Sequence, residues 1–161
     1  MHTVRWTRAG SPAVELDIAI HAPVGAVWQA LVSDEHRRAW WSHLELAPRP
    51  GGVVVERWRN DAGREMTTRG HVLEVEPPHR LRCTWRDDDW PASTEVEFKL
   101  RSEGETTCVR LRHIGWERLG EDAARLAAAH RAGWLTHLEN LKAHAESEAG
   151  LGRPAPDRDL S

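Results

Sequence analysis

Alternation of apolar and polar residues predicts a β-strand at residues 13–20, followed by a short helix. Glu15 and Asp17 separate the apolar positions of this segment, which is the period of a strand with one buried face. The next segment, HAPVGAVWQALVS, is typical of a short helix, because Pro23 fits a first turn in which a missing N–H costs nothing. The buried stripe of this helix comprises Val27, Trp28 and Leu31.

Short strands separated by turns dominate residues 43–114. The turn segments PRPGG, NDAG, PPH and EGE divide this region into consecutive strands, which pair antiparallel when their connections are short. We expect about five or six strands here, each with charged residues on one face. Gly70 is interpreted as a β-bulge, which would turn His71 outward. The clearest strand segments are 53–59, 64–76, 80–86, 93–101 and 106–114.

An amphipathic helix over residues 122–147 is expected to cover the apolar face of these strands. Its apolar stripe, with spacings of three and four, consists of Ala127, His130, Trp134, Leu138, Leu141 and Ala145. At 1.5 Å per residue it is about 39 Å long, enough to cross a curved sheet. The sequence therefore predicts an α+β fold, an antiparallel sheet wrapped around a long C-terminal helix. Residues 1–12 are interpreted as an N-terminal extension, 13–147 as one domain and 148–161 as a flexible tail.

Composition and charge narrow the functional classes. The 161 residues include 22 Lys and Arg against 25 Asp and Glu, a formal net charge of −3, and no basic stripe is interleaved with aromatics, so nucleic acid is not an expected partner. No segment has the apolar length of a signal peptide or a bilayer span, so no membrane association is expected. Cys83 and Cys108 are interpreted as free thiols of a protein in the reducing cytoplasm. A homodimer stays open as an alternative.

The order of elements resembles the helix-grip (START/Bet v 1-like, SRPBCC) superfamily, and in particular its Hsp90-ATPase-activator-like branch. The resemblance rests on IHAPVGAVWQAL, the tryptophans near residue 40, PGG, GHVLEVEPPHRLRCTW, a threonine-led strand ending in LRH, and GWLTHLENLK. It covers residues 13–146 and implies a cavity between the sheet and the long helix for an apolar or aromatic small molecule. It does not imply one activity, because this fold hosts carriers, cyclases, hydrolases and resistance proteins. Hsp90 co-chaperones of this kind carry a separate N-terminal domain, which we do not expect in the residues before the first predicted strand.

A narrower similarity involves AWW, RHIGWERLG and AGWLTHL, which look like stretches of small actinobacterial proteins connected with enediyne antibiotic self-resistance. Enediynes generate carbon radicals that abstract hydrogen, and a glycine Cα–H is an accessible donor. Gly115 and Gly133 are expected near the mouth of the cavity, although turn and helix-packing roles explain them equally well. We assign no sacrificial residue.

Nine tryptophans, against one Phe and no Tyr, carry the functional interpretation. Asp34 is expected to cap a second short helix that runs into Trp40 and Trp41, which lie about 100° apart on a helix. We expect Trp40 to anchor this helix and Trp41 to face a pocket, with the reverse assignment open. Any single Trp is better explained as core, but indoles converging from several elements leave room for a planar ligand. The expected ligand-binding residues are Trp40, Trp41, Trp58, Trp85, Trp90, Phe98, His113, His130, Trp134 and Leu138.

Three titratable residues are candidate acid–base groups: His113, His130 and Glu56. His113 lies on the apolar face of its strand and His130 on the stripe of the long helix, where a satisfied core histidine is the alternative to a catalytic one. Glu56 enters the pocket only if the even-numbered residues of 53–59 face inward, which we favour over the parity that buries Arg57.

No metal or cofactor is expected. His113 and His130 have no Cys or carboxylate nearby in the predicted fold to complete a ligand set. The run RDDDW lacks the alternating ligands of a calcium loop and is interpreted as a solvated hairpin tip. No GxSxG or phosphate loop is present.

The sequence thus favours a binding protein that sequesters a hydrophobic, aromatic or polyketide-type small molecule, for antibiotic self-resistance or biosynthesis. A polyketide cyclase or aromatase is the first alternative, since its acid–base residues would line the same cavity. A protein-interaction module of the co-chaperone kind is the second. The incomplete catalytic constellation favours binding over catalysis.

Overall fold

Eight strands, three α-helices and a 3-10 helix make up the part of the chain that the computed structural model describes, residues 3–6 and 12–151. The strands are β1 (Thr3–Trp6), β2 (Pro12–Ile20), β3 (Leu44–Leu46), β4 (Val53–Arg59), β5 (Glu65–Glu76), β6 (Arg80–Asp87), β7 (Thr94–Glu103) and β8 (Thr106–Ile114). The helices are α1 (Val24–Val32), α2 (Asp34–Trp40), the 3-10 helix η1 (Trp116–Asp122) and α3 (Ala123–Leu151). The predicted α+β fold is confirmed.

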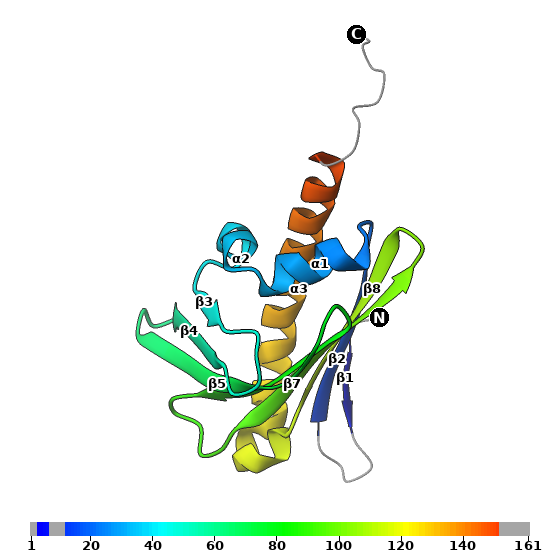
Figure 1. Cartoon of the computed structure of the whole chain (residues 1–161). Helices are drawn as coiled ribbons and strands as arrows, with labels where there is room; N and C mark the ends of the chain where they lie inside the picture. The colour runs from blue at the N-terminus through cyan, green and yellow to red at the C-terminus, as the bar shows by residue number, and fades with distance from the viewer. Residues whose placement is uncertain (1–2, 7–11, 152–161) are drawn as a thin grey trace.

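All strands join one antiparallel sheet in the order β1-β2-β8-β7-β6-β5-β4-β3, so the strands from β3 to β8 form a meander. β2 pairs with β8, the strand that leads through η1 into α3. Figure 1 shows α3 running along one face of the curved sheet, with α1 and α2 packed beside it. The opposite face carries cross-strand ion pairs such as Arg82 with Glu95, 3.0 Å apart. One face of the sheet is thus charged, and the long helix covers the other, apolar face.

The two ends of the fold differ from the sequence-based boundaries. The segment interpreted as an extension contains β1, which pairs with β2 and adds an edge strand. At the other end, α3 continues to Leu151, four residues beyond the expected end of the helix. The rest of the expected tail, 152–161, lies outside the described residues. In the described part of the chain, no helix combines the length and apolar content needed to cross a bilayer.

Helix α2 is capped and anchored by residues that fix the position of its C-terminal end. The cap is Ser33 and not Asp34: the Ser33 hydroxyl accepts from the His36 N–H at 3.5 Å, while Asp34 is the first helical residue and pairs with Arg37. The buried Arg37 guanidinium also donates to the carbonyls of Leu31 (3.2 Å) and Leu46 (3.3 Å). These bonds tie α2 to the end of α1 and to β3, and so fix the point from which Trp41 projects.

The register of β4 and β5 sets which side chains reach the interior. Val54 is buried and Arg57 is exposed, so the even-numbered residues of β4 face inward, as favoured from the sequence. The bulge of β5 lies between Val72 and Glu74 and not at Gly70. A Cβ on Gly70 would lie 1.9 Å from the Thr84 carbonyl oxygen. Glycine is needed there because the neighbouring backbone approaches closely.

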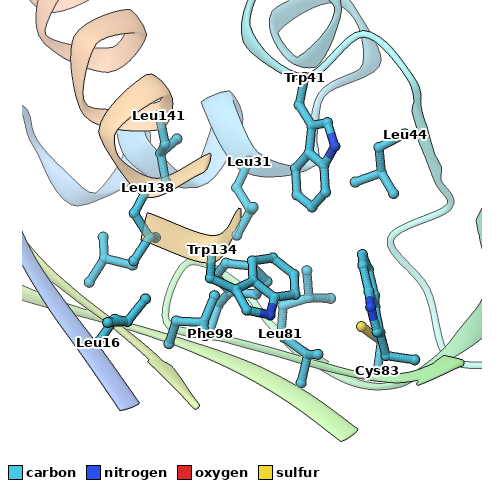
Figure 2. Packing of buried hydrophobic residues seen from close by; sticks show 14 of the residues in the cluster. Leu16, Leu31, Trp41, Leu44, Leu81, Cys83, Phe98, Trp134, Leu138 and Leu141 are labelled. Carbon is cyan, nitrogen blue, oxygen red and sulfur yellow. The ribbon is translucent and has the colours of Figure 1, made fainter. Parts of the chain in front are cut away.

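The core lies between α3 and the sheet. Figure 2 shows Trp134, Leu138 and Leu141 of α3 facing side chains of the strands. Trp41 enters the same core from the end of α2 and is 5% exposed. The predicted stripe of α3 and the inward faces of the strands therefore meet in one interior, and one end of it is hollow.

Candidate functional site

A cavity of about 440 Å³ lies between α3 and the strands β4, β5 and β6. The sheet and the β4–β5 turn contribute Glu56, Trp58, Asp61, Thr68, Trp85 and Asp87. The helix contributes Ala129, His130, Gly133, Trp134 and His137. This volume falls within the range of pockets that hold small molecules. The ligand-binding interpretation depends on a void beneath the C-terminal helix, and the structure has one that is partly open to solvent, since Ala129 and Gly133 of its lining are exposed.

Three indoles form the aromatic wall of the cavity: Trp58, Trp85 and Trp134. The rings of Trp85 and Trp134 are 5.0 Å apart between centroids and tilted by 50°, an arrangement in which each indole still presents surface to a third ring. Trp134 is held from behind by Phe98, edge to face at 5.9 Å. The wall is thus supported by the core.

At one end of the cavity, Trp41 lies behind two of the lining residues, Glu56 and His137. The Trp41 Nε1–H donates to Glu56 Oε2 at 2.7 Å, and the Trp41 ring stacks on His137 at 3.9 Å. Burial raises the pKa of Glu56, an effect that the Trp41 hydrogen bond opposes and the nearby Asp87 increases. Burial lowers the pKa of His137 to about 4. His137 is therefore neutral at pH 7, and its 4.0 Å approach to Glu56 is not an ion pair.

A second polar group, at the end of β6, is built on Asp87. Its carboxylate accepts from the Thr68 hydroxyl at 2.6 Å, and that hydroxyl in turn accepts from Trp58 Nε1 at 2.9 Å. Asp87 is 4% exposed, and burial raises its pKa to about 6, with smaller contributions from Asp88 and Asp89. The interpretation of RDDDW as a solvated hairpin tip is therefore wrong for Asp87, because alternation along β6 turns this residue inward.

Two buried polar atoms of cavity residues have no hydrogen-bond partner in the described structure: Trp85 Nε1 and His137 Nδ1. Trp85 is 5% exposed. A buried donor without a partner costs about 1–3 kcal/mol, so such groups in a native structure need an explanation. Both belong to residues that line the cavity.

His113 is a satisfied core histidine. Trp134 Nε1 donates to its Nδ1 at 2.9 Å. The Thr94 hydroxyl donates to the Trp85 carbonyl at 2.7 Å and so accepts from His113 Nε2 at 2.6 Å. Both ring nitrogens are engaged, the imidazole is fully buried, and burial followed by the neighbouring His130 lowers its pKa well below the ordinary value. The structure thus assigns His113 the alternative role, that of holding the Trp134 wall.

His130 lines the cavity, as expected for a ligand-binding residue. Its Nδ1 lies 3.0 Å from the Leu126 carbonyl, so Nδ1 carries the proton and donates. Burial lowers its pKa, which leaves a neutral ring whose Nε2 can act as an acceptor. His130 therefore stays available for hydrogen bonding.

Several expected ligand-binding residues lie behind or beside the cavity. Trp40 donates from Nε1 to the Ala30 carbonyl at 2.8 Å and anchors α2, as expected, while Trp41 faces inward. Trp90 packs on His130 at 5.1 Å, so it supports a cavity residue. Within the described residues, the cavity lining does not include Trp40, Trp41, Trp90, Phe98, His113 or Leu138.

Four residues line the cavity that were not predicted from the sequence: His137, Asp87, Thr68 and Asp61. His137 could have been found, since it follows Trp134 by three positions and so shares a helix face with it. Of the two glycines considered, Gly133 lines the cavity. Gly115 instead caps η1 with φ of 94°, and a Cβ there would meet Thr94 and Arg118.

Comparison with known protein families shows the family of this chain. A family model described as activator of Hsp90 ATPase homolog 1-like protein matches residues 21–146. The chain belongs to this AHSA1-like family. The match runs from the turn before α1 to the second half of α3 and so contains every residue of the cavity. No curated protein matches the chain.

Solved structures with the same fold include CalU16 from Micromonospora echinospora, which is 25% identical, with a TM-score of 0.69 over 92% of this chain and 85% of CalU16. DynU16, described as a protein in the dynemicin biosynthetic locus, is 25% identical with a TM-score of 0.67, over 85% of this chain and 48% of DynU16. This chain thus spans about half of DynU16. MLL2253 from Mesorhizobium loti shares the fold at 23% identity, with a TM-score of 0.69 over 84% of this chain and 97% of MLL2253. The expected fold and the similarity to proteins of enediyne loci are confirmed.

Proposed function

We propose that the protein binds an aromatic small molecule of polyketide type in the cavity beneath α3 and sequesters it. The observation that carries the proposal is a cavity of about 440 Å³ walled by three indoles, in which buried polar atoms of Trp85 and His137 have no partner among the described residues. A cavity that only reflected loose packing would be apolar and dry. This one has aromatic faces and a few placed polar groups, as ligand pockets do.

The polar groups indicate what the ligand carries. The Trp85 N–H needs an acceptor, such as a carbonyl or hydroxyl oxygen. Glu56 and Asp87 need donors, such as phenolic hydroxyls or an ammonium group, because a buried carboxylate is costly until it is paired or protonated. A planar polyhydroxylated molecule meets both requirements while contacting the indoles of the cavity wall.

The comparisons with known proteins also support the binding of a natural product. DynU16 is described as a protein in the dynemicin biosynthetic locus, and a protein that protects against or handles such a product needs a pocket of this kind. We therefore propose self-resistance or biosynthesis as the biological role. The free thiols Cys83 and Cys108 support a reducing compartment, so we place this role in the cytoplasm.

Tryptophan fluorescence tests the proposal directly. Titration with a hydroxylated anthraquinone is expected to quench emission with a saturating 1:1 curve, because three indoles would contact the ligand. Gly133→Leu should weaken binding at least tenfold, since a Cβ at Gly133 meets nothing within 4 Å and its side chain would enter the cavity. The matched control is Ala132→Leu, on an exposed position of α3 outside the lining.

Equal quenching of Gly133→Leu and wild type, with both proteins folded by circular dichroism, would place any binding outside the cavity and end the proposal. Absence of quenching by hydroxylated anthraquinones and by other fused-ring polyketides would do the same.

An acid–base enzyme of the cyclase kind is a second candidate, favoured by one observation. Glu56 and Asp87 face the same cavity with raised pKa values, the property of carboxylic acids that exchange protons near neutral pH. Turnover of a polyketide substrate that is lost in Asp87→Asn, while binding is retained, would favour catalysis. Binding without any turnover favours sequestration.

A further inference from the structure

The geometry points to a second site, separate from the cavity: His36, His144 and Glu148 form a binding site for a divalent transition-metal ion such as Zn²⁺, joining α2 to α3. One ligand atom from each residue lies within 4.8 Å of the other two. His36 Nδ1 and His144 Nε2 are 3.0 Å apart. None of the three residues lines the cavity.

The local structure explains why these side chains meet. His144 and Glu148 are four residues apart on α3, so they lie on the same face one turn apart. His36 is the third residue of α2, where the Ser33 cap fixes its backbone. The two imidazole rings meet at a centroid distance of 5.2 Å and an interplanar angle of 74°, which brings a nitrogen of each ring to one point.

The distances match the needs of a tetrahedral ion. Zn²⁺ binds histidine nitrogens at about 2.0–2.1 Å, so two nitrogens on one tetrahedral ion are about 3.3 Å apart. The observed 3.0 Å needs only a few tenths of an ångström of side-chain movement. In the metal-free protein one ring donates a hydrogen bond to the other. To bind the ion, the donor ring must carry its proton on its other nitrogen. The facing nitrogens of His36 and His144 can then each direct a lone pair at the ion.

The ligand set defines the class of metal. Two imidazoles and one carboxylate are the protein ligands of open zinc sites, with water in the fourth position. The same nitrogen and oxygen set also accepts Co²⁺, Ni²⁺ and Cu²⁺, with Cu²⁺ the tightest. The half-buried histidines and the exposed Glu148 give the ion a path from solvent. The sequence-based expectation of no metal rested on the spacing of the histidines, and spacing does not connect His36 with His144 because 108 residues separate them.

The site lies at a junction that matters for the cavity. Trp41 follows α2 directly and donates to Glu56 at the end of the cavity. An ion held by His36 and by α3 would fix α2 against α3 and so restrain the position of Trp41. It would also stabilise the folded chain, because an ion that binds only the folded state shifts the unfolding equilibrium.

The experiment uses the full chain, freed of metal with a chelator. Calorimetric titration with ZnCl₂ is expected to give one site per chain, and the Tm to rise by about 3 °C or more at saturating zinc. His36→Gln and His144→Gln should each weaken Zn²⁺ binding at least tenfold and remove the zinc-dependent rise in Tm. Glu148→Gln should weaken binding, and Glu148→His, which restores a ligand, should recover it.

The matched controls are His43→Gln and Glu139→Gln, exposed residues outside the set, which should leave the zinc response unchanged. Co²⁺ provides a direct reading: its visible spectrum should show tetrahedral coordination in the wild type and lose it in His144→Gln. The proposal is overturned if zinc does not bind to the wild type. It is also overturned if His144→Gln binds zinc as tightly as the control His43→Gln and the wild type do.

Discussion

At the scale of single residues, the surroundings of His113, His130 and His137 determine the role of each. His113 is fully buried with both nitrogens bonded, His130 lines the cavity with one nitrogen bonded to its own helix, and His137 stacks on Trp41 with its Nδ1 unpartnered in the described structure. All three have lowered pKa values because of burial. The same residue type therefore supplies a structural bond in the first case and cavity surface in the other two.

Replacing His113 tests its structural role. His113→Ala leaves Trp134 Nε1 and the Thr94 hydroxyl to find new partners and opens a cavity, so we expect a loss of about 3–4 kcal/mol in the free energy of unfolding. Urea denaturation followed by fluorescence measures it. His71→Ala, at an exposed position, should change stability by less than about 0.5 kcal/mol. A loss for His113→Ala no larger than that of His71→Ala would contradict the structural role.

For Asp87 we expect the opposite effect: replacing this residue should stabilise the folded protein. Its pKa is about 6 in the folded state against 3.8 for a free aspartate, so between these pH values the folded state holds more protons than the unfolded state, and stability falls as pH rises. Asp87→Asn keeps an acceptor for Thr68 and removes the charge. We expect it to raise the free energy of unfolding by about 1–2 kcal/mol at pH 7.

The gain from Asp87→Asn should shrink as pH falls from 7 toward 4, because folded Asp87 takes up its proton near pH 6 and the unfolded state does so only near pH 3.8. Urea denaturation at several pH values between 4 and 7.5 measures this, with the exposed Asp89→Asn as the control. A gain that is constant across the pH range would show that the charge of Asp87 is not its cause.

At the scale of elements, α3 combines two tasks on neighbouring faces. Trp134, Leu138 and Leu141 complete the core, whereas Ala129 and Gly133 leave room over the sheet. A glycine inside a helix costs about 0.5–1 kcal/mol relative to alanine. The helix thus carries a destabilising residue at the place where a larger side chain would enter the cavity.

Gly133→Ala should therefore stabilise the protein by about 0.5–1 kcal/mol, since its Cβ meets nothing within 4 Å. Gly70→Ala gives the contrast: its Cβ would meet the Thr84 carbonyl, and a clear loss of stability is expected. Thermal or urea unfolding of both variants measures the effect. Destabilisation by Gly133→Ala would mean that the helix is packed more tightly there than the structure indicates.

At the scale of the whole molecule, burial lowers the pKa values of His113, His130 and His137, and this makes the stability depend on pH in the acid range. The unfolded chain binds protons on them below about pH 6.5, while the folded chain does so only at lower pH, near 4 for His137. Stability contributed by their neutral forms is therefore present at pH 7 and is lost as pH falls through this window.

We expect the free energy of unfolding to fall from pH 7 to pH 4.5, by up to about 1.4 kcal/mol per pH unit for each histidine, partly offset by Asp87. Urea denaturation across this range measures the slope. His137→Gln, which cannot titrate, should flatten it, and the exposed His71→Gln should not. An unchanged slope in His137→Gln would mean that His137 binds protons equally in both states.

Much of the fold was predictable because it follows from local periodicity. The alternation in β2, the turns of the meander and the stripe of α3 are each visible within about ten residues, and their positions agree with the structure. The errors came from details that neighbours decide: Ser33 in place of Asp34 as a cap, the bulge beyond Gly70, and β1 inside the assumed extension. In each case a partner distant in the sequence, or a competing local cap, determined the outcome.

The sequence by itself determined the α+β class, the inward-facing tryptophans of the strands and the family to which the chain belongs. Only the tertiary structure decided which indoles line a cavity and which support them, and that His137 and Asp87 join it. It also brought His36 to His144. The physical reason is that periodicity assigns a side chain to a face, whereas a site needs distances between faces, and these depend on how far α3 stands from the sheet once every side chain between them is packed.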